Sequence, residues 1–127
     1  MLSNTLHVEL PRQSTAPRLA RRAIAAYLGD GFPPEVAETL LLIGNELVTN
    51  AIRHTSGGCV LSLRVDDTEV VVEVHDNDVP LPETTQLEDQ LSRRGLGIVQ
   101  SMATRWGIER HPDGGKLVWA EVLRTRP

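Results

Sequence analysis

Glu46-Leu47-Val48-Thr49-Asn50-Ala51-Ile52-Arg53-His54 is the stretch of sequence that decides the fold. Residues four apart lie one above the other on a helix, so Glu46 and Asn50 share a stripe with either Arg53 or His54. The neighbouring stripe is apolar and consists of Leu40, Ile43, Leu47, Val48 and Ala51. A carboxylate, an amide and a cation beside an apolar helix face indicate the wall of a pocket.

Length and composition favour one domain covering residues 1–127, with a core built from aliphatic side chains, because 40% of the residues are hydrophobic but only 3% are aromatic. The net charge of -4 and the lack of a long basic run argue against nucleic acid as a direct partner. One cysteine, no apolar stretch of ~20 residues and no signal-like start together predict a cytoplasmic protein that does not associate with membranes.

The hydrophobic pattern predicts an α+β fold. An alternating stretch at residues 6–10 predicts an edge strand, and a helical period follows it up to Gly29. The pair Pro33-Pro34 opens the second helix, which runs from about Pro34 to His54. Two hairpins are expected, at residues 59–76 and 106–122, with a short helix between them. This order predicts a two-layer sandwich, with a mostly antiparallel mixed sheet and helices on one face.

Two further segments carry polar or glycine residues at the edges of predicted elements. Asp76 stands where the second strand of the first hairpin ends, and residues 77–94 then show no apolar period, which predicts a mobile lid loop. The run Arg94-Gly95-Leu96-Gly97-Ile98 opens the short helix. Glycine lets backbone amides approach an anion, and a helix N-terminus favours negative charge.

These three motifs resemble those of a known ATPase family. Glu46 to His54 resembles the N box of the domain shared by gyrase, Hsp90, histidine kinases and MutL (GHKL). Asp76 is similar to the aspartate of its first glycine box, and Arg94 to Val99 is similar to its second glycine box. Over residues 6–123 the chain is similar to the free-standing anti-sigma regulatory factors of the serine/threonine kinase type. The resemblance implies a Bergerat fold that binds ATP and Mg²⁺.

The resemblance also assigns a role to each motif residue. Asn50 would coordinate Mg²⁺, Glu46 would act as general base, and Asp76 would accept a hydrogen bond from the adenine amine. The other nucleotide-binding residues that it implies are Arg53, Arg94, Gly95, Leu96, Gly97 and Ile98.

Each of these residues also has a purely structural interpretation. Asn50 is then a helix-face amide hydrogen-bonded to a loop, and Glu46 a carboxylate paired with Arg53 or a neighbouring arginine. Asp76 then forms a turn after its strand, and the Gly95–Gly97 pair makes an ordinary helix-initiating turn. Arg94 is equally well interpreted as a solvated loop charge.

Two positions depart from the family pattern. The first glycine box lacks its glycine, since Asp76-Asn77-Asp78 stands where Asp-x-Gly is usual. Family members often carry a threonine in the penultimate strand, after the Gly-Gly-Lys turn, and its hydroxyl joins the adenine–aspartate water network. Here Leu117 follows Gly114-Gly115-Lys116. Losing one neutral hydrogen bond costs ~1 kcal/mol, or roughly fivefold in affinity. Weakened nucleotide binding is therefore expected.

Three functions compete at this point. The first is an ATP-dependent serine/threonine kinase that phosphorylates an anti-sigma antagonist and binds a sigma factor, and a homodimer is possible as in free-standing relatives. The second is a regulatory module that docks a partner and binds nucleotide weakly or not at all. The third is a fragment of a sensor histidine kinase, against which the start at Met1 and the missing phosphoacceptor helix count.

Overall fold

The computed structural model describes residues 5–55, 57–76, 96–112 and 114–124. Its labelled elements are β1 (Thr5–Leu10), α1 (Ala16–Leu28), α2 (Pro34–His54), β2 (Cys59–Val65), β3 (Glu69–Asp76), β4 (Arg105–Arg110) and β5 (Lys116–Leu123). Residues 96–102 form a further helix. The expected lid loop, with Arg94 and Gly95, lies outside the described residues.

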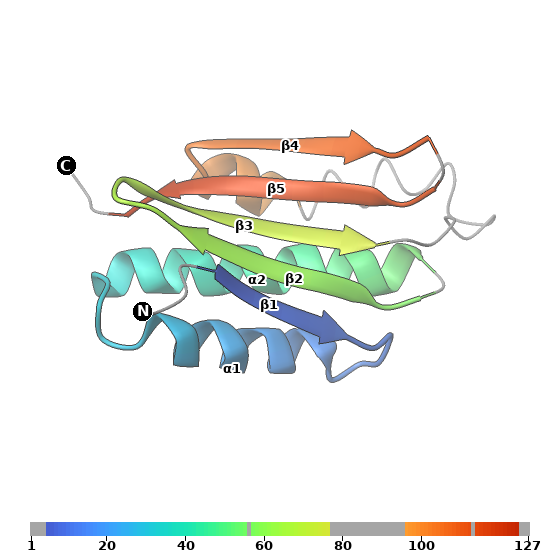
Figure 1. The fold of residues 1–127 in the computed structure, drawn as a ribbon, viewed down its shortest axis with the longest axis horizontal. Coiled ribbons are helices and arrows are strands. Elements are labelled where there is room, and N and C mark those ends of the chain that lie inside the picture. Colours follow the sequence, from blue (N-terminus) through green and yellow to red (C-terminus); the bar gives the residue numbers. More distant parts are fainter. Residues whose placement is uncertain (1–4, 56, 77–95, 113, 125–127) are drawn as a thin grey trace.

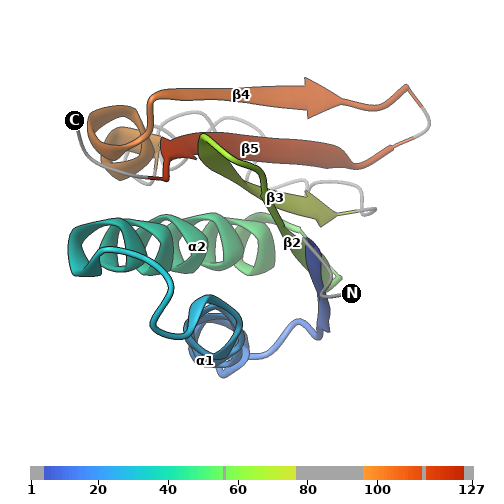
Figure 2. The ribbon, with the colours of Figure 1, turned by 60° about the vertical axis from the view of Figure 1, so that its left-hand side comes forward.

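The strands form one sheet in the order β1-β2-β3-β5-β4. All four pairings between the described strands are antiparallel, so the sheet is antiparallel throughout rather than mixed. Helices α1 and α2 cover one face of the sheet, and a turned view shows the two layers edge-on (Figures 1 and 2). The predicted two-layer α+β architecture is confirmed.

Helix α2 has the predicted bounds and buries the predicted stripe. Its apolar residues Leu40, Ile43, Leu47, Val48 and Ala51 are all buried. Gly44 allows α1 to approach closely, since a Cβ there would lie 2.5 Å from Cδ1 of Ile24. The end of the helix is tied down by Thr55, whose hydroxyl donates a hydrogen bond to the carbonyl of Ala51 at 2.7 Å.

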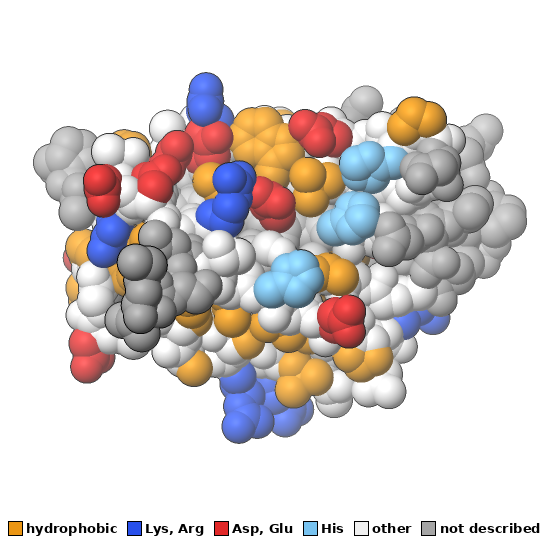
Figure 3. Space-filling view, in the orientation of Figure 1, with side chains coloured by type: hydrophobic (Ala, Val, Ile, Leu, Met, Phe, Trp, Pro, Cys, Tyr) orange, Lys and Arg blue, Asp and Glu red, His pale blue; other side chains and the backbone are white. Residues whose placement is uncertain are grey.

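Strand alternation separates a buried face of the sheet from an open one. On β3, Val70, Val72 and Val74 are buried toward the helices, and Asp76 falls in the same set. The opposite face carries polar pairs, among them Arg64 with Glu73 at 2.9 Å. Histidine and charged side chains gather on this open face (Figure 3). The parity of each strand therefore decides which polar residues face α2.

The junction between α2 and β2 requires glycine at position 58. A Cβ on Gly58 would collide with the carbonyl oxygen of Leu10 and lie 3.2 Å from Cα of Pro11, and both are backbone atoms that cannot rotate away. We expect Gly58→Ala to destabilise the fold by about 1–3 kcal/mol, because the end of β1 must shift. Urea unfolding followed by circular dichroism measures this change.

Gly31→Ala is the matched control, since its Cβ would meet only the carbonyl oxygen of Leu28, at an ordinary 3.7 Å. Equal unfolding midpoints for the two variants would contradict the expected collision at Gly58.

Candidate functional site

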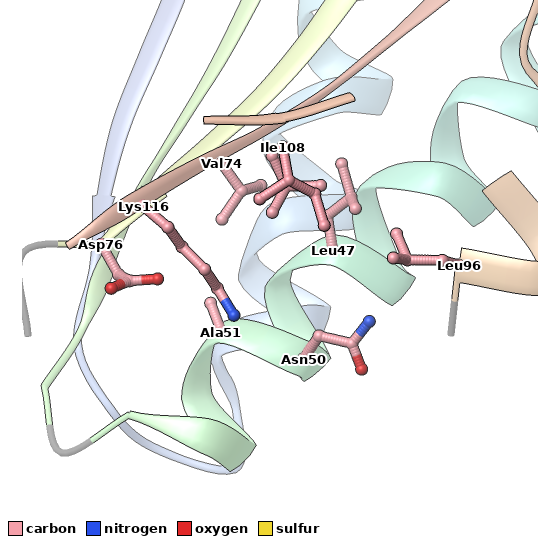
Figure 4. Close-up of a pocket in the computed structure, with 9 residues that line it drawn as sticks. Leu47, Asn50, Ala51, Val74, Asp76, Leu96, Ile108 and Lys116 are labelled. Carbon is pink, nitrogen blue, oxygen red and sulfur yellow. The ribbon is translucent and has the colours of Figure 1, made fainter. Parts of the chain in front are cut away.

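One hollow lies between α2 and the adjoining ends of β3 and β5, and we call it the central hollow. It contains ≈ 340 Å³ of space, counting its open mouth. Its polar lining consists of Asn50, Asp76 and Lys116, which come from three elements far apart in the sequence (Figure 4). Its apolar lining consists of Leu47, Ala51, Val74, Leu96, Ile108 and Val118.

The structure brings Asn50 and Asp76 to this hollow, as the motif order predicted. Asn50 is half-buried and follows Leu47 by one turn on the buried side of α2. Glu46 lies one turn before Asn50 and is also half-buried, but it is not among the described residues that line the hollow. The helix therefore presents an amide to the hollow and a carboxylate beside it.

Asp76 reaches the hollow because its side chain lies on the same face of β3 as the buried valines. It is only 2% exposed. The negative charge of Asp76 acts on the thiol of Cys59, the first residue of β2. Burial, and then the negative charge of Asp76, raise the pKa of Cys59 to about 11. The thiol therefore stays protonated at neutral pH, which makes Cys59 a core residue rather than a nucleophile.

Lys116 is the lining residue that the sequence interpretation missed. It is the direct Cα partner of Asp76 in the β3–β5 register, whereas Leu117 pairs with His75 on the open face. Leu117, which stands where the family resemblance expects a threonine, therefore does not lie beside Asp76 in this structure, and Lys116 occupies that position. Val118, Ala120 and Val122, which continue the inward set of β5, were the signal that could have shown this parity.

Arg53 is not brought together with Asn50 and Asp76. It is exposed and lines a second hollow of ≈ 690 Å³, together with Thr49 of α2 and with Arg12, which precedes α1. Thr49 and Arg53 are four residues apart and line this second hollow together, so Arg53 lies on the stripe of α2 next to the start of α1. The phosphate contact implied for Arg53 therefore has no support from its placement.

The helix at residues 96–102 contributes one side chain to the central hollow. Leu96 lines it and is 7% exposed. Gly97 and Ile98 follow in the first turn and are half-buried, but neither is among the described lining residues. A Cβ at Gly97 would meet nothing within 4 Å, so space alone does not require glycine there.

The donor set fits a metal that takes few protein ligands. No group of three or more histidine, cysteine, aspartate or glutamate residues that could hold a metal ion occurs among the described residues. Mg²⁺ needs no such cage, because it retains several waters and binds through one or two protein oxygens together with substrate phosphates. The amide oxygen of Asn50 fits that pattern, and the neighbouring apolar side chains are of the kind that line small-molecule sites.

An amide-bearing helix, a strand-end carboxylate and a second helix start around one hollow define a nucleotide-binding domain of the ATPase type. The chain matches the histidine kinase-like ATPase domain family over residues 10–121, and it belongs to that family. This places it in the GHKL superfamily, whose domains bind ATP with Mg²⁺ and serve as kinases or ATPases. No match was found among curated proteins. No helix in the described part of the chain is long and apolar enough to cross a membrane.

Proposed function

We propose that the protein is a cytoplasmic, Mg²⁺-dependent serine/threonine kinase that phosphorylates an anti-sigma antagonist and also binds a sigma factor. The observation that carries the proposal is the meeting of Asn50 and Asp76 in one hollow on a histidine kinase-like ATPase fold. A homodimer, as in free-standing relatives, is part of the same proposal.

In this proposal, different lining residues contact different parts of the nucleotide. Leu47, Val74 and Ile108 offer apolar surface to the purine ring, and Asp76 accepts a hydrogen bond from the exocyclic amine. Asn50 lies across the hollow from Asp76 and offers a neutral oxygen to the metal (Figure 4). Bound Mg–ATP supplies the γ-phosphoryl group and neutralises part of its charge.

Glu46 is the residue that we place at the chemical step. It lies one turn before Asn50 on the same stripe of α2, beside the side chain that would hold the metal. The substrate hydroxyl oxygen bonds to the γ-phosphorus, its proton passes to the Glu46 carboxylate, and the bond to the bridging oxygen breaks so that ADP leaves. Proton acceptance of this kind contributes about 10²–10⁴-fold to the rate.

A partner-docking module is the second candidate, and one observation favours it. Lys116 is buried in the central hollow beside Asp76, and Leu117, where the family resemblance leads one to expect a hydroxyl, pairs with His75 instead. A module of this kind would bind its sigma factor or antagonist without turnover.

A thermal-shift titration tests the choice between the two candidates. ATP or ADP that binds the folded protein must raise its melting temperature, and Mg²⁺ should enlarge the shift for the kinase. Transfer of label from γ-labelled ATP to a purified antagonist domain would then establish the activity. Absence of any nucleotide-dependent shift, with binding to a sigma factor retained, would favour the docking module.

A further inference from the structure

The Lys116 side chain crosses the central hollow. It extends from the start of β5 toward α2, and its ammonium ends near Ala51, between Asp76 and Asn50 (Figure 4). It is 7% exposed, and among the described lining residues it is the one cation. Lysine side chains are rarely buried to this extent, so a lysine that lines a hollow, rather than projecting into solvent, calls for an explanation.

Lys116 and Asp76 form a pair with complementary hydrogen-bonding capacity. They are direct partners across β3 and β5, which places their Cβ atoms about 4.5–5.5 Å apart on the same face. An ionised carboxylate only accepts hydrogen bonds, and an ammonium only donates them, through three N–H groups. Side by side, the two groups offer an acceptor and a donor to the same ligand edge.

Adenine presents the matching pattern. Its exocyclic N6 amine donates, and the ring nitrogens N1 and N7 on either side of that amine accept. Asp76 by itself accepts a hydrogen bond from the amine only, so the adjoining ring nitrogen would have to accept one from water. Lys116 can donate one N–H to Asp76 and another to a ring nitrogen, because its ammonium ends in the hollow between Asp76 and Asn50 (Figure 4).

We propose that Lys116 is a base-reading residue, which donates a hydrogen bond to N1 or N7 of adenine while Asp76 accepts from N6. The assignment rests on the proposed nucleotide site, and it adds a specificity-determining residue to it. Two other roles for a cation here make different predictions. If Lys116 neutralised phosphates, the loss of affinity on its replacement would grow from adenosine to ADP to ATP. If Lys116 blocked the hollow, its replacement would tighten nucleotide binding.

The test is calorimetric titration of wild type and Lys116→Met with adenosine, ADP and Mg–ATP. We expect Lys116→Met to bind about ten- to a hundredfold more weakly, as is usual when a hydrogen bond to a charged group is lost. The factor should be the same for all three ligands, because the contact is to the base. Arg110→Met is the matched control, since Arg110 is the Cα partner of Lys116 on β4 but is exposed and not among the lining residues. It should change affinity little.

Wild-type protein provides a second test that does not depend on the variant folding. It should bind either 1-deaza- or 7-deazaadenosine more weakly than adenosine, and Lys116→Met should not distinguish that analogue from adenosine. Unchanged or tighter ATP binding by folded Lys116→Met would overturn the assignment, as would a loss that grows from adenosine to ATP. Wild-type affinity insensitive to both analogues would overturn it too. Failure of the wild type to bind any of these ligands would instead overturn the proposed function, and the assignment with it.

Discussion

Replacing Asn50 with alanine is expected to abolish Mg²⁺-dependent nucleotide binding and to leave the fold intact. In the proposed function the amide oxygen is the metal-ligating group that α2 presents to the central hollow, and alanine can offer no ligand in its place. Losing it should cost several kcal/mol of nucleotide affinity, on the order of a hundredfold or more. Helix α2 should tolerate the change, because Asn50 is only half-buried and alanine is the best helix former.

Calorimetric titration of ATP with and without Mg²⁺ measures the expected loss at Asn50. Thr49→Ala is the matched control, because Thr49 is the preceding half-buried residue of α2 but lines the second hollow rather than the central one. Its nucleotide affinity should remain that of the wild type. If Asn50→Ala lowered the melting temperature as much as a core substitution such as Leu47→Ala, Asn50 would be structural and the proposed metal contact would be wrong.

The parts of the fold that were predictable carry strong local signals. Helix α2 begins after Pro33 and ends before a glycine pair, and its apolar period matches 3.6 residues per turn throughout. The hairpin of β2 and β3 alternates with period two, and the Asp66 carboxylate closes its turn by accepting the backbone N–H groups of Thr68 and Glu69 at 2.8 Å. Local chemistry therefore specified these elements without reference to the rest of the chain.

The positions that were missed depend on tertiary packing. From helical spacing alone, either Arg53 or His54 could share the stripe of Asn50. The start of α1 packs beside Arg53 and forms the second hollow with it, and this contact could not be predicted from spacing. At Lys116 the obstacle was register, because a shift of one residue exchanges the two faces of a strand. Gly114 and Gly115 both have positive φ values, so the turn before β5 does not reveal from sequence which residue first faces inward.

Exchanging Glu46 for glutamine should remove phosphoryl transfer and leave nucleotide binding near the wild-type level. Glutamine keeps the size and hydrogen-bonding reach of glutamate but cannot accept a proton at neutral pH. We therefore expect the rate of ADP formation to fall about 10²–10⁴-fold, both with an antagonist domain and with water as acceptor. Chromatographic measurement of ADP release, with ATP affinity measured in parallel by calorimetry, separates the two effects.

Glu38→Gln is the control for this charge change, since Glu38 lies two turns earlier on α2 and is exposed. It removes the same charge from the same helix and should leave both ADP release and affinity unchanged. If Glu46→Gln lost ATP affinity to the same extent as turnover, Glu46 would be a binding residue. Retained turnover in Glu46→Gln would mean that another group accepts the proton, because no carboxamide can do so.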